Sequence, residues 1–213
     1  MKACHWSNLP PEGFEVISST FAYEDTYTID GEFDKYEVRL CPRGCDQIDS
    51  YRQTCAPTPQ FAVLRLLRIL SMRINAQMTQ FDITQAFQHP DIDEKIWFTL
   101  PTGFSLDGCT YAVANTGLQG IKQAARLWYK AYDTFCLELH SDVRKSESEP
   151  CLYGVWTSTG KAAWSIRMDD NFGLSDPPSF FIARMDAAEK MGYYTSEYNV
   201  YYPWYVYHSI PTP

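Results

Sequence analysis

The chain has 213 residues and a formal net charge of −8, and its residues are 45% hydrophobic and 15% aromatic. This length suits one domain, or one domain with a small lobe, and the apolar fraction is sufficient for a buried core. No apolar run reaches the ~18 residues that a membrane-spanning helix needs, and the first six residues lack the apolar stretch of a signal peptide. We therefore expect an intracellular protein, cytoplasmic or nuclear, with no membrane partner.

The seven cysteines are scattered without paired spacing, which is typical of reduced thiols in an intracellular chain. Cys41 and Cys45 form the one close pair, and neither a second pair nor a nearby histidine completes a zinc-binding set. A metal or redox role for this pair stays open as the alternative.

The negative charge is unevenly distributed along the chain. Residues 1–47 carry 4 basic and 9 acidic side chains, residues 48–130 carry 8 and 6, and residues 131–213 carry 6 and 11. Proteins that grip a nucleic-acid backbone normally present a basic face, because phosphate neutralisation supplies most of the affinity. Only the middle segment is basic, so we expect weak nucleic-acid binding by this chain alone.

Apolar patterns in the first third of the chain predict a hairpin and then a helix. Alternating apolar residues flank Asp30-Gly31, a dipeptide typical of type I′ turns, and predict a β-hairpin over residues 20–40. After a proline-containing connector, Thr58 and Pro59 have the composition of an N-cap and a first helical position. Apolar residues then recur at helical spacing, and we expect the buried stripe to comprise Phe61, Leu64, Leu67, Leu70 and Ile74.

The middle of the chain predicts four strands and a second helix. The strands are expected over residues 78–83, 96–100, 151–156 and 162–168, and the helix over 121–140. Residues 170–173 have turn composition, which would place the tandem aspartates at a hairpin tip. This order of elements predicts an α+β domain, with a small antiparallel sheet backed by helices.

The composition changes after the two prolines at positions 177 and 178. Residues 179–192 are predicted to form a helix, and residues 193–207 are rich in tyrosine and tryptophan. We expect this aromatic tail to pack as an edge strand or to remain exposed.

Acidic residues lie at the ends of two of the predicted apolar strands. Asp82 ends the strand over 78–83, and Asp169-Asp170 follow the strand over 162–168, with a glycine-containing turn at 118–123 between them. Carboxylates from two strand ends, brought side by side, can hold two divalent cations that stabilise the attacking and leaving oxygens of a phosphoryl transfer. Solvated turn acids and a strand-end cap remain the structural alternatives.

The motifs around these aspartates resemble the reverse transcriptase of copia-type long-terminal-repeat retrotransposons. The likeness runs in order, with near-gapless spacing, over about residues 10–176. Four segments in the first half of the chain are similar to family patterns: 36–44 to Y-K-A-R-L-V-A-K-G, 54–57 to T-F-A-P, 82–87 to D-V-K-T-A-F and 91–96 to D-L-D-E-E-I. Four more follow: 101–104 is similar to P-E-G-F, 118–129 to L-Y-G-L-K-Q-A-P-R-Q-W-Y, 146–153 to R-S-E-S-D-P-C-L-Y and 168–170 to V-D-D.

The resemblance implies a right-hand polymerase fold with fingers and an antiparallel palm sheet, and RNA- or DNA-templated DNA synthesis. Asp82, Asp169 and Asp170 would be the catalytic residues and would hold two Mg²⁺, or Mn²⁺ in their place, with the Ile83 carbonyl as a further ligand. The implied partners are a nucleic-acid template-primer and deoxynucleoside triphosphates.

The same resemblance implies a set of substrate-binding residues. Phe87 would crowd a ribose 2′-hydroxyl, although it also fits a core aromatic. Gln119 and Gly120 would lie beneath the incoming nucleotide, because a glycine lets the backbone approach closely. Three cations would meet triphosphate or template, or would simply be exposed charges: Arg39, Arg43 and Lys122.

Several positions depart from the family pattern. Glu37 stands where the family has lysine, Glu24 and Tyr27 fall at usually basic positions, and Arg167 replaces the tyrosine before V-D-D. Each loss of a basic residue should weaken template binding. We therefore expect a fingers and palm domain over 1–176, a divergent tail over 177–213, no thumb, and weak or absent processive synthesis.

Two other interpretations remain open. The first is a non-catalytic retroelement remnant or interaction module that docks a partner through the aromatic residues of 193–207. An active enzyme would instead need four basic residues to line one cleft with the aspartates: Arg39, Arg43, Lys122 and Arg126. The second is an unrelated α+β protein, which requires the order of the motifs to be coincidence. Aspartate Cα atoms more than ~12 Å apart would support the unrelated protein, because a metal-bridging site cannot span that distance.

Overall fold

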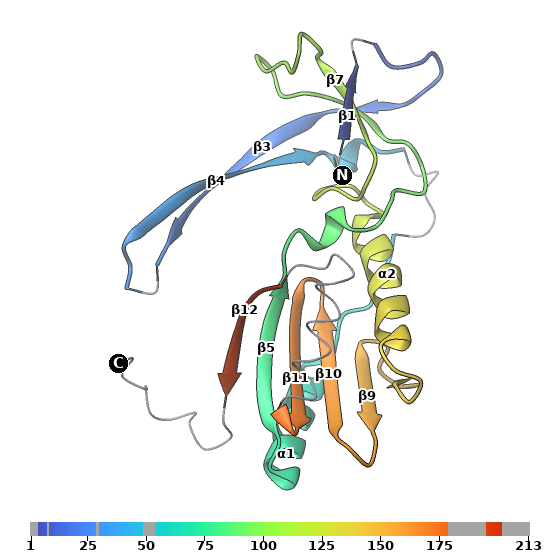
Figure 1. The fold of residues 1–213 in the computed structure, drawn as a ribbon. Coiled ribbons are helices and arrows are strands. Elements are labelled where there is room, and N and C mark those ends of the chain that lie inside the picture. The colour runs from blue at the N-terminus through green and yellow to red at the C-terminus, as the bar shows by residue number, and fades with distance from the viewer. Residues whose placement is uncertain (1–3, 8, 29, 49–53, 179–194, 202–213) are drawn as a thin grey trace. The chain divides into compact units, whose positions relative to one another are not determined.

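The computed structural model describes residues 4–7, 9–28, 30–48, 54–178 and 195–201, with the backbone alone for 195–201 (Figure 1). The chain divides into two compact units. The first comprises residues 1–55 and 87–128, and the second comprises residues 56–86 and 129–213.

The first unit is built on a mixed four-stranded sheet. Its strands lie in the order β1 (Cys4–Ser7), β7 (Tyr111–Ala114), β6 (Trp97–Thr99) and β2 (Val16–Ile17). The β2–β6 pair is parallel and the other two pairs are antiparallel. The core beneath it contains Ile17, Phe98, Leu100, Ala112, Ala114, Leu118, Ile121 and Ala124.

A long hairpin forms a separate two-stranded sheet in the same unit. β3 (Ser19–Tyr27) pairs antiparallel with β4 (Phe33–Pro42), which confirms the hairpin predicted over residues 20–40. The loop closes with hydrogen bonds from the Gly31 N–H to the Thr28 carbonyl and from the Thr28 N–H to the Glu32 carbonyl. Gly31 adopts a positive φ of 83°, which glycine tolerates without strain. The short 3₁₀ helix η1 (Gly44–Asp46) follows β4.

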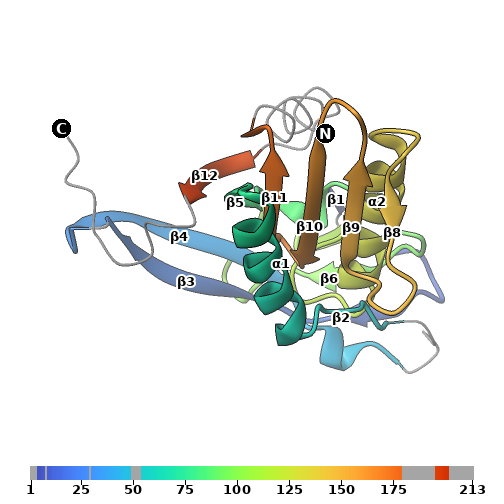
Figure 2. The ribbon, with the colours of Figure 1, turned by 90° about the horizontal axis from the view of Figure 1, so that it is seen from below.

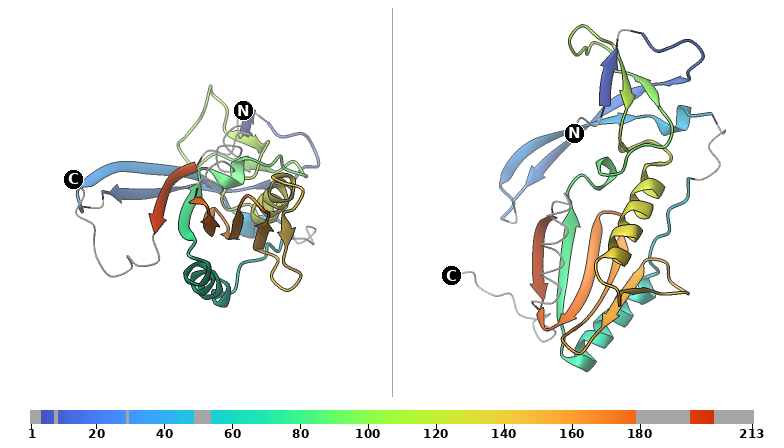
Figure 3. Two further views of the ribbon diagram at one scale, coloured as in Figure 1. Left: turned by 60° about the horizontal axis from the view of Figure 1, so that its bottom comes forward. Right: turned by 45° about the vertical axis from the view of Figure 1, so that its right-hand side comes forward.

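The second unit contains a six-stranded antiparallel sheet. Its edge strand β12, red in the right-hand view of Figure 3, pairs with β5, which is green there. The opposite edge is β8. In spatial order the strands are β12 (Thr195–Tyr201), β5 (Gln77–Ile83), β11 (Asp170–Asp176), β10 (Lys161–Arg167), β9 (Leu152–Trp156) and β8 (Arg144–Lys145).

Helix α1 (Phe61–Ile74) and the second half of α2 (Ala124–Glu138) pack against opposite faces of this sheet (Figure 2). Neighbours on β10 face opposite ways, because side chains alternate along a strand. Ala163 joins the cluster beneath α1, whereas the Trp164 indole donates to Cys136 Sγ of α2 at 3.4 Å.

Helix α1 begins later than predicted. Gln60 is its extended N-cap residue, so the prediction of Pro59 as the first helical residue is wrong. The Gln60 N–H donates to the Glu149 carboxylate at 3.3 Å, so a distant side chain caps the helix. Phe61 is 66% exposed, so its place in the predicted stripe is wrong, whereas Leu67 is buried and Leu70 and Ile74 pack against the core as expected. Val63 and Ser71 complete the buried side of the helix.

The turn predicted at residues 170–173 is also wrong, because these residues begin strand β11. Met168 and Asp169 make the turn, and ladder pairing with β5 and β10 outweighs the local turn composition. Residues 179–194, where a helix was predicted, lie outside the described residues. No helix of the described chain is long and apolar enough to cross a bilayer.

Candidate active site

Asp82 and Asp170 lie side by side on neighbouring strands of the second unit. Asp82 is the penultimate residue of β5 and Asp170 is the first of β11, and the two are direct partners in the antiparallel register. Residues paired in this way have Cα atoms roughly 4.5–5.5 Å apart. The separation beyond ~12 Å that would have supported an unrelated protein is therefore absent.

The turn that carries Asp169 is tied to the end of β5. Arg167 pairs with Asp170, so Met168 and Asp169 form the two-residue loop between β10 and β11. The Ile83 N–H donates to the Asp169 carbonyl at 3.1 Å, which extends the ladder into the loop. Met168 has a φ of 59°, a left-handed conformation that costs a non-glycine residue roughly 1–2 kcal/mol. The loop keeps this strained conformation because both flanking strands fix it.

A buried hydrogen-bond chain reaches the same turn from the α2 side. The Tyr132 hydroxyl donates to Asn171 Oδ1 at 2.6 Å, and Asn171 Nδ2 donates to the Asp169 carbonyl at 3.0 Å. Both side chains are buried. Sequence reasoning missed these two positioning residues. The available signal was an asparagine, directly after the tandem aspartates, in a segment that proved to be a buried strand.

The two paired aspartates face the same side of the sheet as α1. Along β11, Asp170 shares its face with Phe172 and Leu174, which belong to the cluster beneath α1. Along β5, Asp82 shares its face with Met78 of the same cluster. The carboxylates therefore stand where the sheet extends past the start of α1.

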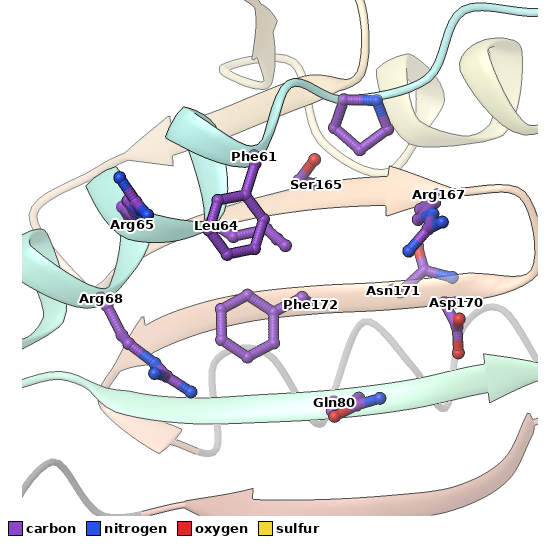
Figure 4. Close-up of a pocket in the computed structure, with 11 residues that line it drawn as sticks. Phe61, Leu64, Arg65, Arg68, Gln80, Ser165, Arg167, Asp170, Asn171 and Phe172 are labelled. Carbon is purple, nitrogen blue, oxygen red and sulfur yellow. The ribbon is translucent and has the colours of Figure 1, made fainter.

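A cavity of about 300 Å³ opens beside Asp170 on this face (Figure 4). Its walls come from the start of α1 and from strands β5, β10 and β11. They include three arginines, Arg65, Arg68 and Arg167. The Arg65 guanidinium lies 4.8 Å from the centre of the Phe61 ring, a cation–π contact at the rim.

One wall of this cavity contains a polar group with an unmet hydrogen bond. Ser165 is 2% exposed, and its Oγ has no partner among the described residues. A buried hydroxyl without a partner costs about 1–3 kcal/mol. The cavity itself offers the cationic side chains of its walls to an anionic ligand.

The donor set at the strand ends fits a hard cation held in an open site. Carboxylate oxygens are the ligands that Mg²⁺ prefers, and it commonly takes one or two of them and completes its shell with water and substrate phosphates. Within the described residues, no group of three or more His, Cys, Asp or Glu side chains is placed to hold a metal ion. The geometry thus gathers Asp82 and Asp170 and leaves Asp169 in the adjoining turn.

Gly120, predicted to lie beneath a nucleotide, is in the first unit, where its backbone meets the end of β4. Its carbonyl accepts a hydrogen bond from the Gly44 N–H at 3.0 Å. Gly120 has a φ of 104°, and a Cβ at this position would lie 2.3 Å from the Pro42 carbonyl oxygen. The close approach that requires glycine here is therefore made by the chain itself.

Lys122 is also held by protein groups. Its Nζ donates to the Gln47 carbonyl at 2.8 Å, and its backbone N–H donates to Gln47 Oε1 at 2.8 Å. Gln47 Nε2 in turn donates to Gln123 Oε1 at 3.1 Å in the buried interior. These contacts fasten the glycine turn to the segment after β4 and give Lys122 a structural role.

Arg39 is engaged by two glutamates on its own hairpin. Its guanidinium lies 2.8 Å from Glu37 and 3.2 Å from Glu24. The hydrogen bond from Arg39 lowers the pKa of Glu37, and the same bond raises the pKa of Arg39. Both glutamates would compete with a triphosphate for Arg39.

The remaining predicted residues of the first unit divide between surface and core. Arg43 and Gln119 are exposed, Arg43 directly after β4 and Gln119 in the glycine turn. Phe87 lies in the 3₁₀ helix η2 (Ala86–Gln88) and packs, half-buried, against the core that includes Ile17 and Phe98. Its role as a sugar-selecting residue stays a prediction.

Residues 7–177 match the family model of the reverse transcriptase (RNA-dependent DNA polymerase), and the chain belongs to this family. The resemblance to copia-type retrotransposons is confirmed by similarity to retrovirus-related Pol polyproteins of plant transposons. The chain is 28% identical over 148 residues to the retrovirus-related Pol polyprotein from transposon TNT 1-94 of Nicotiana tabacum, and the match covers 67% of this chain and 11% of the relative. It is 24% identical over 181 residues to that of transposon RE1 from Arabidopsis thaliana, covering 83% of this chain and 12% of the relative. The chain thus spans about a tenth of the length of these relatives.

Proposed function

We propose that this domain carries out nucleotidyl transfer, joining a deoxynucleoside triphosphate to a primer 3′-hydroxyl under the direction of an RNA or DNA template. The observation that carries the proposal is the direct pairing of Asp82 on β5 with Asp170 on β11, with Asp169 in the loop between β10 and β11. The fingers and palm assignment of the two units belongs to the same proposal.

The three carboxylates are proposed to hold two Mg²⁺, or Mn²⁺ in their place, with the Ile83 carbonyl as a further ligand. When bound, these ions supply positive charge that stabilises the attacking and leaving oxygens of an in-line displacement. The contribution of the chain is to fix the carboxylates in position. The strand register sets Asp82 against Asp170, and the contacts of Ile83 and Asn171 hold the carbonyl of Asp169.

The arginine-lined cavity supports an anionic substrate at this position. Arg65, Arg68 and Arg167 surround a space that reaches Asp170, so a phosphate there would meet cations while its metal ions meet carboxylates. A guanidinium can bind two phosphate oxygens at once, which orients the group as well as attracting it. A triphosphate or a backbone phosphate satisfies this chemistry.

Template binding is proposed to be weak. The net charge is −8, and the predicted finger cation Arg39 is already paired with Glu24 and Glu37. Affinity for a nucleic-acid backbone grows with the number of phosphates neutralised, so each cation held by an internal acid reduces it. Slow extension with frequent dissociation is the expected behaviour.

Primer extension on a homopolymer template, with Mg²⁺ or Mn²⁺, tests the proposal. The chain is compared with an Asp169→Asn/Asp170→Asn variant, and Asp176→Asn serves as the matched control because it lies exposed at the far end of the same strand. Extension that persists in the control and disappears in the double variant supports nucleotidyl transfer. Extension that survives loss of both aspartates, or no extension by the wild-type chain under any condition, contradicts it.

A further inference from the structure

The β3–β4 hairpin has one predominantly apolar face. The register pairs Phe21 with Leu40 and Tyr23 with Val38, and alternation along each strand places these side chains on the same side. Near the loop, Phe33 lies 4.7 Å from Tyr36 and 6.2 Å from Tyr27, between ring centres. We call this side the aromatic face; it comprises Phe21, Tyr23, Tyr27, Phe33, Tyr36, Val38 and Leu40, together with Asp25, the cross-strand partner of Tyr36.

The opposite face of the hairpin is charged and internally satisfied. Glu24 and Glu37 are direct cross-strand partners, an arrangement of like charges that is unfavourable alone. Arg39 bridges both carboxylates and offsets that repulsion. The hairpin as a whole (residues 19–42) carries 6 acidic and 2 basic side chains, a net charge of −4.

Most of the aromatic face is open to solvent. Its base is covered, because the Phe21 ring packs edge-on against Phe104 at 5.2 Å between centres. Further out, Tyr23 is 74% and Tyr36 is 76% exposed. A two-stranded sheet is marginally stable alone, and a contiguous exposed apolar patch usually marks a site of association.

The same chain carries a surface of complementary character on α1. Leu66, Ile69 and Met72 are 53–58% exposed and follow one another at three-residue spacing, which places them along one side of the helix. The exposed side of α1 also carries three arginines, Arg65, Arg68 and Arg73. No acidic residue occurs between positions 54 and 81.

We propose that the aromatic face of the hairpin in one copy of this chain docks onto the exposed side of α1 in a second copy. Apolar side chains would meet Leu66, Ile69 and Met72, while Asp25 on the aromatic face, within a hairpin of net charge −4, would be attracted to the α1 arginines. Nucleic acid is a poorer occupant of the aromatic face, because a hairpin with a net charge of −4 repels phosphate. This association does not require nucleotidyl transfer, although Arg65 and Arg68 also line the cavity proposed for the substrate phosphate.

The contact joins two different surfaces and is therefore heterologous. Two copies that exchange hairpins reciprocally close a dimer, and copies that do not close form longer chains. The exposed part of the aromatic face offers on the order of 500–600 Å² on each side, somewhat below the ~800 Å² per partner of a standard interface. We therefore expect association in the micromolar range and not a permanent dimer.

A complementation experiment tests this docking. One variant, Tyr23→Ser/Tyr36→Ser, disables the hairpin and keeps α1, and a second, Leu66→Ser/Ile69→Ser, disables α1 and keeps the hairpin. Sedimentation velocity from about 1 to 200 µM measures self-association of each chain. We expect the wild-type chain to associate, each variant alone to associate at least tenfold more weakly, and an equimolar mixture of the two variants to form a 1:1 complex.

The controls separate docking from misfolding. Ala22→Ser/Lys35→Ser introduces two serines on the opposite face of the same hairpin and should associate like wild type. Far-ultraviolet circular dichroism and a cooperative melt establish that each variant is folded, and partner formation in the mixture is independent proof of intact surfaces. A wild-type chain that remains monomeric at 200 µM, or folded variants that do not combine on mixing, overturns the proposal.

Discussion

Asp170 is the direct cross-strand partner of Asp82, although the two residues are 88 positions apart in the chain. The pairing depends on the register of β11 against β5. A slip of one residue would turn every side chain of β11 to the other face and would separate the carboxylates. The interactions that lock this register are therefore as important to the candidate site as the acids themselves.

Removal of the Tyr132 hydroxyl should destabilise the turn that carries Asp169. Tyr132→Phe leaves the buried Asn171 Oδ1 without this donor, and we expect a loss of about 1–2 kcal/mol in the free energy of unfolding. Urea denaturation measures this loss. Tyr129→Phe is the control, because that hydroxyl makes an exposed hydrogen bond to the Pro150 carbonyl from the same helix. Equal effects of the two substitutions would contradict the proposed role of Tyr132.

Gly120 should be intolerant of a side chain because of the close backbone contact. In Gly120→Ala, the new Cβ would lie 2.3 Å from the Pro42 carbonyl oxygen, in addition to the strain of the positive φ. Gly108→Ala supplies the matched control, since Gly108 also has a positive φ but a Cβ added there would meet no atom within 4 Å. We expect the free energy of unfolding to fall by about 1 kcal/mol in the control, from backbone strain alone, and by roughly 2–3 kcal/mol or more in Gly120→Ala. Thermal or urea unfolding measures both, and equal losses would show that the contact with Pro42 is unimportant.

Release of Arg39 from its glutamates should strengthen nucleic-acid binding. Glu24→Gln/Glu37→Lys removes both carboxylates that pair with Arg39 and adds a cation at position 37. We expect tighter binding of a template-primer in fluorescence anisotropy. The slope of log affinity against log salt concentration should steepen by an amount that corresponds to roughly one to two additional phosphate contacts. The control Asp142→Gln/Glu147→Lys changes the net charge equally at exposed positions of the second unit. If both variants bind equally well, net charge explains the gain and the Arg39 pairs do not.

The two buried thiols of the second unit should be unreactive in the folded chain. Burial raises the pKa of Cys136 to about 12 and that of Cys151 to about 11. Because the thiolate is the reactive form, only a minute fraction of either thiol is ionised at pH 8. We expect a thiol reagent at that pH to label exposed Cys45 and Cys55 quickly and the buried pair only after denaturation. Peptide mass mapping distinguishes the sites, and rapid native labelling of Cys136 would contradict this packing.

The sequence patterns predicted the elements whose burial follows a simple period. Strands β5 and β10 and helix α2 lie close to their expected ranges, because each alternates or repeats apolar residues against one core. Short strands such as β2 (Val16–Ile17) escaped prediction, since two residues are too few to show a period. The start of β11 was predicted as a turn, because its Asp-Asn composition is outweighed by pairing with β5, which local composition does not reveal.

The candidate site was predictable as a set of residues but not as a set of contacts. The aspartates followed from strand ends and from the family resemblance. The pairing of Arg39 with Glu24 depends on cross-strand register, and the bond from Tyr132 to Asn171 joins α2 to β11. The close approach of Gly120 to Pro42 likewise joins segments about 80 residues apart. Such contacts exist only once the chain has folded, so no local pattern signals them.

Binding of Mn²⁺ in the presence of a deoxynucleoside triphosphate tests most directly whether Asp82 and Asp170 form one metal site. Electron paramagnetic resonance measures the free ion for the wild-type chain, Asp82→Asn, Asp170→Asn and the double variant, with Asp176→Asn as control. We predict that each single substitution weakens Mn²⁺ binding by about tenfold or more. The fold-loss of affinity in the double variant should be much smaller than the product of the two single fold-losses, because both residues serve one site. Wild-type affinity in either single variant, or fully independent losses, would contradict the account.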